Sequence, residues 1–563
     1  MKDFPWLAQY PAHVPAEIDP DRYPSIPGLL DHIAAKNPNR PIFTNMNVSL
    51  TAKQTLDLSN DLAAYLQSLP NMNRGDRVAI MMPNLLQNII AIFAILRAGF
   101  VVVNVNPLYT ARELEHQLKD SGAKAIIIIE NFAKTLERVI DHSPIEHVIT
   151  TQVGDLFPTV KRLLVNTVIK HVKKMVPPFS LPKAVSFRDA LSRGHASTLK
   201  PVDLKNEDIA FLQYTGGTTG VSKGAMLTHR NILANVEQTG YWISGQFKEC
   251  QEVAMCALPL YHIFALTSSL SFMNWTSNIV LITNPRDLKG LVKEIKHWDF
   301  SVMTGVNTLF NALLHNEEFK QFHFTKLKLT VAGGAQIQKS VAESWKNATN
   351  CSILEAYGLT ETSPGVCGIL ADAPWDGSVG YPLPSTNVTI RGEGFADLGR
   401  CADPSDPAQV EACTGEICVK GPQVMLGYWN RPEETAGVFR DGWLRTGDVG
   451  FMTAEGKITI TDRKKDMILV SGFNVYPNEV ESVIASHPKV LECGVVGVPH
   501  GKSGETVKAV IVKKDPSLTA EEIQSYCRTQ MTGYKIPRQI VFVESLPKTA
   551  VGKILRRELK DIQ

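Results

Sequence analysis

A segment rich in glycine and threonine, at residues 214–224, contains the residue types that bind phosphate groups. It reads Tyr-Thr-Gly-Gly-Thr-Thr-Gly-Val-Ser-Lys-Gly. Glycines let the backbone approach a ligand closely, and successive exposed N–H groups can surround an anion. The threonine hydroxyls add donors and Lys223 adds a positive charge, so the segment predicts a polyphosphate site. Its spacing is not that of a Walker P-loop, because a glycine follows Lys223 where serine or threonine is required.

Further candidate residues lie in short motifs that follow this segment along the chain. The motifs are Leu-Pro-Leu-Tyr-His at 258–262, Gly-Gly-Ala at 333–335, Tyr-Gly-Leu-Thr-Glu at 357–361, Gly-Trp-Leu-Arg-Thr-Gly-Asp at 442–448 and Gly-Lys at 552–553. They supply carboxylates, an imidazole, an ammonium group and glycine strips. These are the groups that hold a metal ion, a sugar or a negatively charged transition state.

Each charged residue in these motifs also has a structural interpretation. Glu361 is a hard oxygen ligand suited to Mg²⁺, but a lone acid can equally cap a helix or lie on the surface. Asp448 lies in a tight Thr-Gly-Asp turn, where turn chemistry by itself favours aspartate. His262 lies in an apolar segment and Lys553 in a basic tail, so burial in the core and simple solvation are their alternatives.

The elements that must position these residues are predicted by the hydrophobic pattern. In the first third, short apolar runs alternate with helical patterns: strand 78–81, helix 86–98, strand 100–105, helix 111–121 and strand 125–129. This alternation is typical of a parallel α/β sheet with covering helices. A second α/β section is expected at 208–370, where residues 209–212 lead into the phosphate segment and a helix begins near Thr228. A more β-rich section follows at 378–460.

The pattern changes near Thr461, after the polar junction Thr-Asp-Arg-Lys-Lys. The last hundred residues predict a helix at 479–486, strands at 495–498 and 507–512, a helix after the capping box Thr519-x-x-Glu522, and a strand at 539–543. We therefore expect a small α+β domain at the end of the chain.

Composition excludes several classes of protein. The chain has 563 residues, 58 Lys and Arg against 56 Asp and Glu, and nine cysteines. It is too long for one core, and its balanced charge argues against nucleic acid as a partner. The cysteines form no Cys-x-x-Cys pair, which favours a reduced, cytoplasmic setting. The longest apolar run, 89–96, is far shorter than the roughly 20 residues that span a bilayer.

The ordered motifs resemble those of the adenylate-forming (AMP-forming acyl-CoA synthetase) superfamily over essentially the whole chain. Residues 441–481 are similar to the fatty-acyl signature of long-chain fatty-acid–CoA ligases. The resemblance implies a large, multi-subdomain α/β N-terminal adenylate-forming domain at 1–461 and a hinge at 462–465. It also implies a small, mobile α+β C-terminal domain at 466–563 that carries the catalytic lysine.

The activity implied by the resemblance has two steps. A fatty acid reacts with ATP to give acyl-AMP and pyrophosphate, and the acyl group then passes to coenzyme A, feeding fatty-acid degradation. Alternatives are an acyl-AMP ligase that loads a carrier protein, a CoA ligase for medium-chain or aryl acids, and an inactive lipid-binding scaffold. Dependence of turnover on CoA distinguishes the proposed ligase from an acyl-AMP ligase that loads a carrier protein. A panel of acids distinguishes it from a ligase for medium-chain or aryl acids. Absence of ATP–pyrophosphate exchange would favour the inactive scaffold.

The resemblance also implies a role for each motif residue. Lys553 reaches the carboxylate and α-phosphate, His262 gates the acyl pocket, and Glu361 binds Mg²⁺. Thr215 and Lys223 complete the catalytic set. Binding of ATP and CoA is assigned to Tyr214, Thr215, Gly216, Gly217, Thr218, Thr219, Gly220, Lys223, Gly334, Ala335, Tyr357, Gly358, Thr360, Asp448, Arg463 and Gly472.

Residues 159–176 predict a separate feature, because they carry five basic residues and no acidic one. On a helical wheel the basic residues from Arg162 to Lys174 gather on one side and apolar residues on the other, with a few out of place. Such a helix can lie in the interface of an anionic leaflet, or simply pack on the protein surface. We expect a cytoplasmic protein with peripheral association at the cytoplasmic face of the membrane. The sequence leaves the oligomeric state open, with a homodimer as one alternative.

Overall fold

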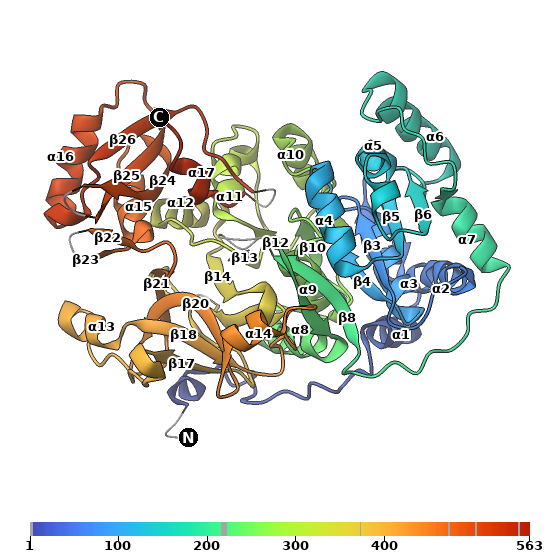
Figure 1. Ribbon diagram of the computed structural model, residues 1–563, viewed down its shortest axis with the longest axis horizontal. Helices are drawn as coiled ribbons and strands as arrows, with labels where there is room; N and C mark the ends of the chain where they lie inside the picture. Colours follow the sequence, from blue (N-terminus) through green and yellow to red (C-terminus); the bar gives the residue numbers. More distant parts are fainter. Residues whose placement is uncertain (1–3, 216–221, 372, 471–472, 502–503, 550–551) are drawn as a thin grey trace.

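The computed structural model describes residues 4–215, 222–371, 373–470, 473–501, 504–549 and 552–563. In these residues the strands form one nine-stranded, one seven-stranded and two five-stranded sheets. Three of the sheets build a large N-terminal part, and the fourth, drawn in red, belongs to a smaller C-terminal part (Figure 1). The predicted α/β class, with a large part followed by a small one, is confirmed; the exact domain bounds stay a prediction.

The seven-stranded sheet is built by residues 77–228, in the order β7-β6-β5-β3-β4-β8-β9. Its strands are β3 (Arg77–Met81), β4 (Val101–Asn104), β5 (Ala125–Ile129), β6 (His147–Thr151), β7 (Val185–Ser186), β8 (Ile209–Thr215) and β9 (Lys223–Thr228). All neighbours are parallel except β8 and β9. The alternating pattern predicted this parallel arrangement, because strands buried on both faces read as unbroken apolar runs.

Helices α3 (Leu86–Arg97) and α4 (Ala111–Ser121) connect these strands. Helix α4 begins with a complete capping box between Thr110 and Glu113 and ends at Gly122, which has a φ of 61°. These local signals explain why its bounds were predicted correctly from sequence. Helix α3 is buried almost throughout and packs in one apolar cluster with residues of both large sheets.

The nine-stranded sheet has the order β16-β15-β14-β13-β12-β10-β11-β1-β2. Its strands are β1 (Pro41–Asn45), β2 (Val48–Thr51), β10 (Val253–Cys256), β11 (Asn278–Leu281), β12 (Val302–Gly305), β13 (Leu329–Gly333), β14 (Ile353–Gly358), β15 (Gly365–Gly368) and β16 (Tyr381–Pro382). Helices α8 (His229–Ile243) and α9 (Ile263–Asn274) pack on each other and share its core. Strand ends of this sheet carry three of the predicted motifs.

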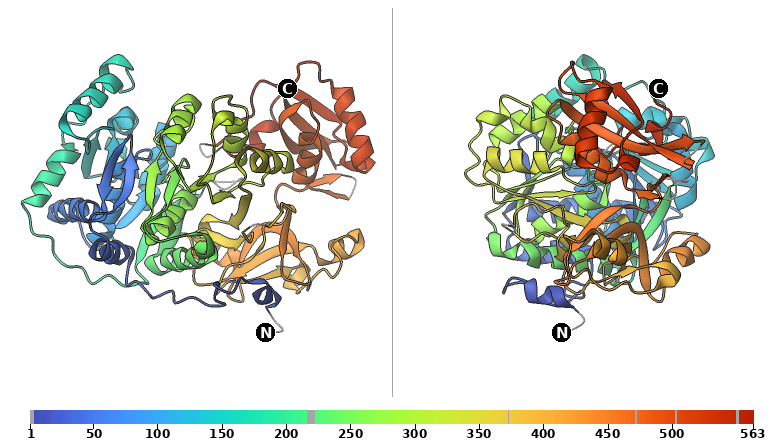
Figure 2. Two further views of the ribbon diagram at one scale, coloured as in Figure 1. Left: turned by 180° about the vertical axis from the view of Figure 1, so that it is seen from behind. Right: turned by 90° about the vertical axis from the view of Figure 1, so that its left-hand side faces the viewer.

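The third sheet contains β17 (Asn387–Arg391), β18 (Gly415–Lys420), β19 (Phe439–Arg440), β20 (Trp443–Met452) and β21 (Ile458–Arg463). The small part has β22 (Ile468–Val470), β23 (Phe473–Val475), β24 (Val490–His500), β25 (Gly504–Lys513) and β26 (Gln539–Val543), with α15 (Pro477–Ala485), α16 (Ala520–Gln530) and α17 (Arg556–Leu559). It has its own buried apolar cluster. Figure 2 shows it beside the large part from two further directions.

Three details differ from the sequence prediction. Strand β9 lies between the phosphate segment and α8, so Lys223 is a strand residue and the helix does not follow the loop directly. The capping box at α16 is half formed: Thr519 accepts from the N–H of Glu522, whose side chain pairs with Lys489 instead. The helix expected over 159–176 consists of α6 (Thr159–Thr167) and a π-helical segment, Val168–Val172.

Candidate functional site

Three predicted residues meet where strands of two different sheets come together. Tyr357, near the end of β14, donates a hydrogen bond from Oη to Asp448 Oδ2 at 2.8 Å. Arg463 Nε lies 3.0 Å from Asp448 Oδ1. Asp448 and Arg463 are opposite each other in the β20–β21 register, so backbone pairing sets their ion pair. Both oxygens of the buried Asp448 therefore have partners from this cluster.

Burial and charge fix the protonation states in this cluster. Burial raises the pKa of Tyr357 well above its usual range, and the neighbouring Asp448 carboxylate raises it further. The phenol therefore remains a donor to Asp448. Burial works against the charge of Arg463, but the attraction of Asp448, Asp466 and other nearby acidic groups together outweighs it, and the pKa of Arg463 is raised. The cluster presents a guanidinium beside a carboxylate that accepts hydrogen bonds on both oxygens.

Glycines border the cluster. Gly334 follows β13, has a φ of 80° and is exposed, and a Cβ at this position would meet no atom within 4 Å. The neighbouring Ala335 is half-buried, and together the two form a low strip with open space above Gly334. Gly358 is different, because a Cβ there would lie 1.9 Å from the carbonyl oxygen of Pro364. Gly358 is thus required for close packing of its own backbone.

The ends of the predicted phosphate segment lie on two paired strands. Thr215, the last residue of β8, is opposite Lys223, the first residue of β9. Lys223 Nζ lies 3.1 Å from Glu434 Oε2, and Tyr214 Oη donates to Asp120 Oδ2 at 2.7 Å. The hairpin therefore brings a hydroxyl and an ammonium group together. Gly216, Gly217, Thr218, Thr219 and Gly220 lie outside the described residues.

Glu361 is joined to Lys223 through a residue that sequence reasoning missed. Glu361 lies with the half-buried Thr360 on a single 3₁₀ turn, and its Oε1 accepts a hydrogen bond from Tyr428 Oη at 2.6 Å. Lys223 Nζ lies 5.4 Å from the centre of the Tyr428 ring, a cation–π distance. The aromatic pair at 428–429, in a loop that is otherwise short of charges, is a signal that could have indicated Tyr428.

Lys553 reaches this site from the small part. Its backbone N–H donates to Thr549 Oγ1 at 3.1 Å, and the preceding carbonyl, of Gly552, accepts from Thr308 Oγ1 of α11 (Asn307–Leu314) at 3.4 Å. Burial and the charge of Arg463 lower the pKa of Lys553 to about 8, although Asp448 acts in the opposite direction. Lys553 therefore lies among the residues of the strand-end cluster.

His262 lies at the N-cap of α9 and is half-buried. Burial lowers its pKa to about 4, and the positive charge of Lys553 contributes in the same direction. His262 is therefore neutral at pH 7 and lies within electrostatic reach of Lys553. Gly472 is outside the described residues. Its neighbour Phe473 stacks on Tyr534 of the small part, with ring centroids 4.8 Å apart, and thus makes its aromatic contact away from the cluster.

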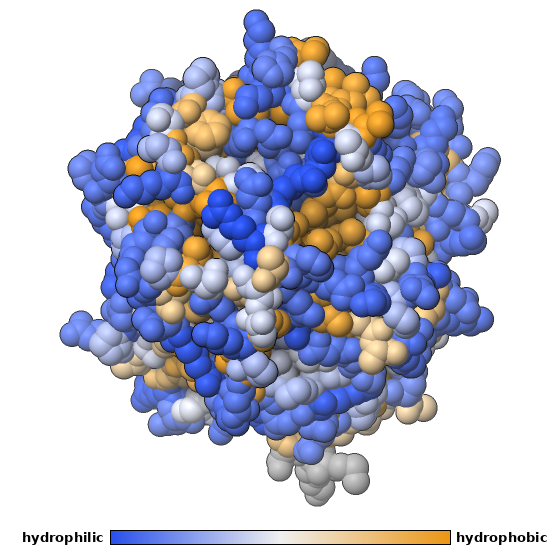
Figure 3. All heavy atoms as spheres, turned by 90° about the vertical axis from the view of Figure 1, so that its right-hand side faces the viewer, coloured by the Kyte–Doolittle hydropathy of each residue, from blue (hydrophilic) through white to orange (hydrophobic). Residues whose placement is uncertain are grey.

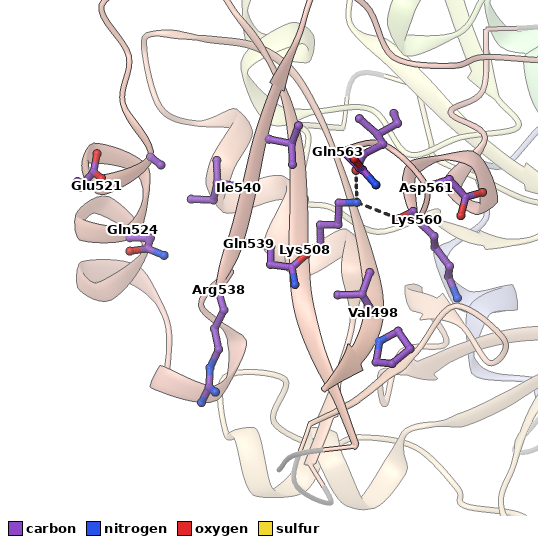
Figure 4. A pocket seen from close by; sticks show the side chains of 14 residues that line it. Val498, Lys508, Glu521, Gln524, Arg538, Gln539, Ile540, Lys560, Asp561 and Gln563 are labelled. Carbon is purple, nitrogen blue, oxygen red and sulfur yellow. Dashed lines mark hydrogen bonds between the residues drawn. The ribbon is translucent and has the colours of Figure 1, made fainter. Parts of the chain in front are cut away.

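A hollow of about 1060 Å³ on the small part contains none of the predicted site residues. Its lining includes Lys508 of β25, which donates to the carbonyl of Lys560 and, more closely, to that of Ile562 (Figure 4). Lys508 is buried and ties the end of the chain to the sheet. The hollow is therefore explained by the docking of the C-terminal segment beside β25.

Taken together, the site brings cations from three elements toward two carboxylates. Lys223 comes from β9, Arg463 from β21 and Lys553 from the small part, while Asp448 and Glu361 supply the acids. Such a site can bind a nucleotide and neutralise negative charge as two anions approach each other. Neither Ser nor Cys is needed as a nucleophile in chemistry of this type.

Comparisons with known proteins match this arrangement. The model of the AMP-binding enzyme family matches residues 30–429, and that of the AMP-binding enzyme C-terminal domain matches residues 479–553. The chain is 53% identical over 558 residues to a long-chain-fatty-acid–CoA ligase of Salmonella typhimurium, covering 99% of this chain and 98% of the relative. A protein of that name from Bacillus subtilis is 37% identical, covering 99% and 97%.

A solved structure is also similar. The crystal structure of ATP-bound MatB from Rhodopseudomonas palustris superimposes with a TM-score of 0.80 at 26% identity, covering 95% of this chain and 98% of the other. The similarity extends through both parts of the chain.

Proposed function

This chain belongs to the AMP-binding enzyme family, and we propose that it is a long-chain fatty-acid–CoA ligase. The reaction type rests on one observation above all. Lys553, from the small domain, lies within electrostatic reach of Arg463 and Asp448, in a site that also contains Lys223 and Glu361. The acid class rests on the relatives of that name that align with 99% of the chain.

In the first half-reaction a carboxylate oxygen attacks the α-phosphorus of ATP. The bond from this phosphorus to the oxygen bridging the β-phosphorus breaks, and pyrophosphate leaves with the electron pair. The carboxylate and the triphosphate are both anions, so positioning and charge neutralisation dominate over general base catalysis. Lys553 and Arg463 offset charge at the reacting centre, and Lys223 with Thr215 offsets charge on the departing pyrophosphate.

The nucleotide is held by the strand-end cluster. We assign the ribose hydroxyls to Asp448, whose two carboxylate oxygens can accept both of them. The adenine ring lies between Tyr357 and the low strip at Gly334 and Ala335, where the space above Gly334 is open. Gly358 contributes by allowing β14 to approach Pro364, which fixes Tyr357. Thr360 and Tyr214, with the glycines and threonines at 216–220, complete the phosphate side.

Mg²⁺ fits this site at Glu361. Mg²⁺ is commonly held by one or two carboxylates together with substrate phosphates. Glu361 supplies one half-buried carboxylate, kept in place by the Tyr428 hydroxyl on one of its oxygens. When bound, the ion offsets charge on the ATP phosphates. Tyr428 and Lys223 orient the groups around it.

In the second half-reaction the thiolate of CoA attacks the acyl carbon of the adenylate. The carbon–oxygen bond to AMP breaks, and AMP leaves with the electron pair. Lys553 has no role in this step, and we propose that the small domain turns about a hinge at 462–465, with Lys465 as the pivot, to withdraw it. Residues 471–473, which include Gly472, are then proposed to line the path of the pantetheine arm, and His262 to gate the acyl pocket.

We also propose that α6 and the π-helical segment after it touch a membrane surface. Among the described residues, no helix has the length and apolarity needed to cross a bilayer. The apolar side of α6 and of the π-helical segment faces solvent: Val160 is 81% exposed, Leu164 63% and Val172 71%. Figure 3 shows the side of the molecule that carries α6, with apolar side chains at the surface among hydrophilic ones. An apolar face flanked by lysines suits an anionic leaflet.

Contacts with the rest of the protein hold α6 and the segment after it in place, but they leave some of the lysines exposed to solvent. Asn166 Oδ1 accepts from the N–H of Gly154 at 2.8 Å, and Lys170 Nζ lies 3.6 Å from Glu130. Lys173 and Lys174 are exposed at the end of the segment. Reversing these two charges is expected to weaken binding to vesicles of anionic phospholipid, whereas reversing the exposed Lys289 and Lys293 of α10 (Leu288–His297) is not. Equal binding of both variants would contradict the proposal.

Homodimer formation is a separate prediction, which sedimentation analysis would test.

The test of the function is AMP release by the purified protein with MgATP, across saturated fatty acids of short to long chain, each with and without CoA. CoA-dependent turnover that is greatest with long chains is expected. A maximum with aryl or medium-chain acids would overturn the acid class. Accumulation of acyl-AMP unaffected by CoA would point to transfer to a carrier protein, and no ATP–pyrophosphate exchange would indicate a non-catalytic protein.

A further inference from the structure

A cluster of charged residues joins the two domains on the far side of β21 from the site. At its centre is Arg556, three residues after Lys553. Its Nη1 lies 3.2 Å from Asp462 Oδ1 and 3.2 Å from Asp466 Oδ2. Its Nε and Nη2 donate to Glu481 at 3.1 and 2.9 Å, and Nη2 also donates to Asn478 Oδ1. One guanidinium therefore contacts three carboxylates and an amide.

Asp462, the first residue of the proposed hinge, is the member of this cluster that is fixed to the large domain. Its backbone pairs with Val449 of β20, so it is part of the third sheet. Its side chain is fully buried and accepts, at 2.8 Å on Oδ2, the N–H of Asn478 at the start of α15. Two groups of the small domain, one from Arg556 and one from Asn478, thus converge on one carboxylate of the large domain.

The alternation of side chains along β21 links this contact to the active site. Neighbouring residues of a strand point to opposite faces. Arg463 faces Asp448 and the nucleotide cluster, whereas Asp462 faces Arg556. The same two residues of β21 therefore hold the site on one face and the small domain on the other.

The segment that carries Lys553 is tied to this cluster through Arg556. Lys548 and Ile554 form an isolated β-bridge, and the N–H of Leu555 donates to the carbonyl of Pro547 at 2.9 Å. Lys548 Nζ donates to Glu492 at 2.7 Å on one side, and Arg556 anchors the chain on the other. The position of Arg556 therefore determines where the short segment before it, with Lys553, is directed.

We propose that Asp462 and Arg556 are positioning residues that form a latch, which holds the small domain in the orientation used for adenylation. The inference rests on the proposed function with its two half-reactions. If the small domain turns about 462–465, Asp462 stays with β20 while Arg556 and Asn478 move away. The bonds of Arg556 to Asp466 and Glu481 are within the small domain and persist. The latch therefore stabilises the first state and is absent from the second.

Electrostatics support the same picture. Burial raises the pKa of Asp462 to about 6, and the charge of Arg556 opposes this rise. Removing one partner of a buried ion pair leaves an uncompensated charge, which is strongly unfavourable. Without Arg556, the acidic side chains of Asp462, Asp466 and Glu481 would face one another. The domains would then separate more readily from the orientation that brings Lys553 to the site.

The test compares Arg556→Gln with wild type in each half-reaction separately. Adenylation is followed by ATP–pyrophosphate exchange, and thioester formation by single-turnover reaction of prepared acyl-AMP with CoA. We expect exchange to fall by about tenfold or more, and thioester formation to stay within about twofold. Arg557→Gln is the matched control, because Arg557 is 65% exposed and lies 3.9 Å from its neighbour Glu558. The control is expected to leave both rates unchanged.

A second variant guards against a folding defect, because Arg556 also has partners inside the small domain. Asp462→Asn removes the charge on the large-domain side and leaves the bonds of Arg556 to Asp466 and Glu481 in place. It is expected to slow pyrophosphate exchange while leaving thioester formation nearly unchanged. The double variant Asp462→Asn/Arg556→Gln is expected to exchange pyrophosphate no more slowly than Arg556→Gln alone. Equal loss of both half-reactions in both variants, or no loss in either, would overturn the latch. Absence of exchange in the wild type would instead overturn the proposed function.

Discussion

The nucleotide cluster and the lysine that completes it are built in contrasting ways. Tyr357, Asp448 and Arg463 are held by strand pairing inside the large domain, with bonds of 2.8 and 3.0 Å between them. Lys553 arrives from the other domain, whose contacts on the large domain include Thr308 and Asp462. In the proposed mechanism, the groups used throughout the reaction are fixed in sheets, whereas the group used in one half-reaction is carried by the small domain, which turns away.

The largest expected effect comes from removing Lys553, the group that the small domain carries. Lys553→Ala removes the ammonium group that offsets charge between carboxylate and α-phosphate. We expect ATP–pyrophosphate exchange to fall by about 10³-fold, the upper end for loss of one preorganised donor. Lys553→Arg keeps the charge with a different shape and is expected to retain part of the rate. A Lys553→Ala variant that exchanges pyrophosphate at the wild-type rate would contradict the assignment.

Removing Asp448, which strand pairing holds in the large domain, is expected to give a smaller effect, but one that reaches both half-reactions. Asp448→Ala removes the acceptor for the ribose and leaves Tyr357 and Arg463 without their shared partner. The KM for ATP should rise by about 10²-fold, because a hydrogen-bonded charge is lost from the binding site. Thioester formation from acyl-AMP should also weaken, since the AMP moiety occupies the same cluster. If the variant formed thioester from acyl-AMP at the wild-type rate, the assignment of ribose binding to Asp448 would be contradicted.

The pH dependence of the two half-reactions tests the role of Lys553 in the wild-type protein, without any mutation. Burial and Arg463 lower the pKa of Lys553 to about 8. Lys553 is therefore charged below this pH and neutral above it, so adenylation should fall by up to about tenfold per pH unit above 8. Thioester formation from acyl-AMP should lack this fall. His262, with a pKa of about 4, does not titrate in the same range. A fall of identical shape in both half-reactions would contradict the role of Lys553.

The smallest effect is expected at Tyr428. Tyr428→Phe removes the hydroxyl that donates to Glu361 at 2.6 Å but keeps the ring near Lys223. We expect a loss of about three- to tenfold in adenylation, because one hydrogen bond to a charged group is removed. The Mg²⁺ concentration needed for half-maximal exchange should rise. A change in rate with no change in Mg²⁺ dependence would assign Tyr428 to Lys223 and not to the metal site.

Sequence reasoning worked best where the signal is local. The bounds of α4, β5 and β26 were predicted correctly, since caps and apolar runs lie within the elements themselves. The pairing of Asp448 with Arg463 follows from strand register, which the motifs did not specify. The bonds from Tyr428 to Glu361 and from Arg556 to Asp462 join residues 67 and 94 positions apart, and no local pattern encodes them.

The helix at 159–176 illustrates a different limit. Its charge pattern was visible in the sequence, but amphipathicity does not say which face is covered. The structure places Asn166 against Gly154 and leaves Val160 and Leu164 in solvent. Only tertiary packing determines that choice. The exposure of these apolar residues is the observation on which the proposed membrane contact rests.

The division between a fixed nucleotide cluster and a removable lysine is tested most directly by one measurement. Prepared acyl-AMP is mixed with CoA and the Lys553→Ala variant, and thioester formation is followed in a single turnover. A rate within about twofold of wild type is predicted, because Lys553 acts only before the acyl-AMP exists. A loss as large as that in pyrophosphate exchange would show that Lys553 serves both half-reactions, and would contradict the account.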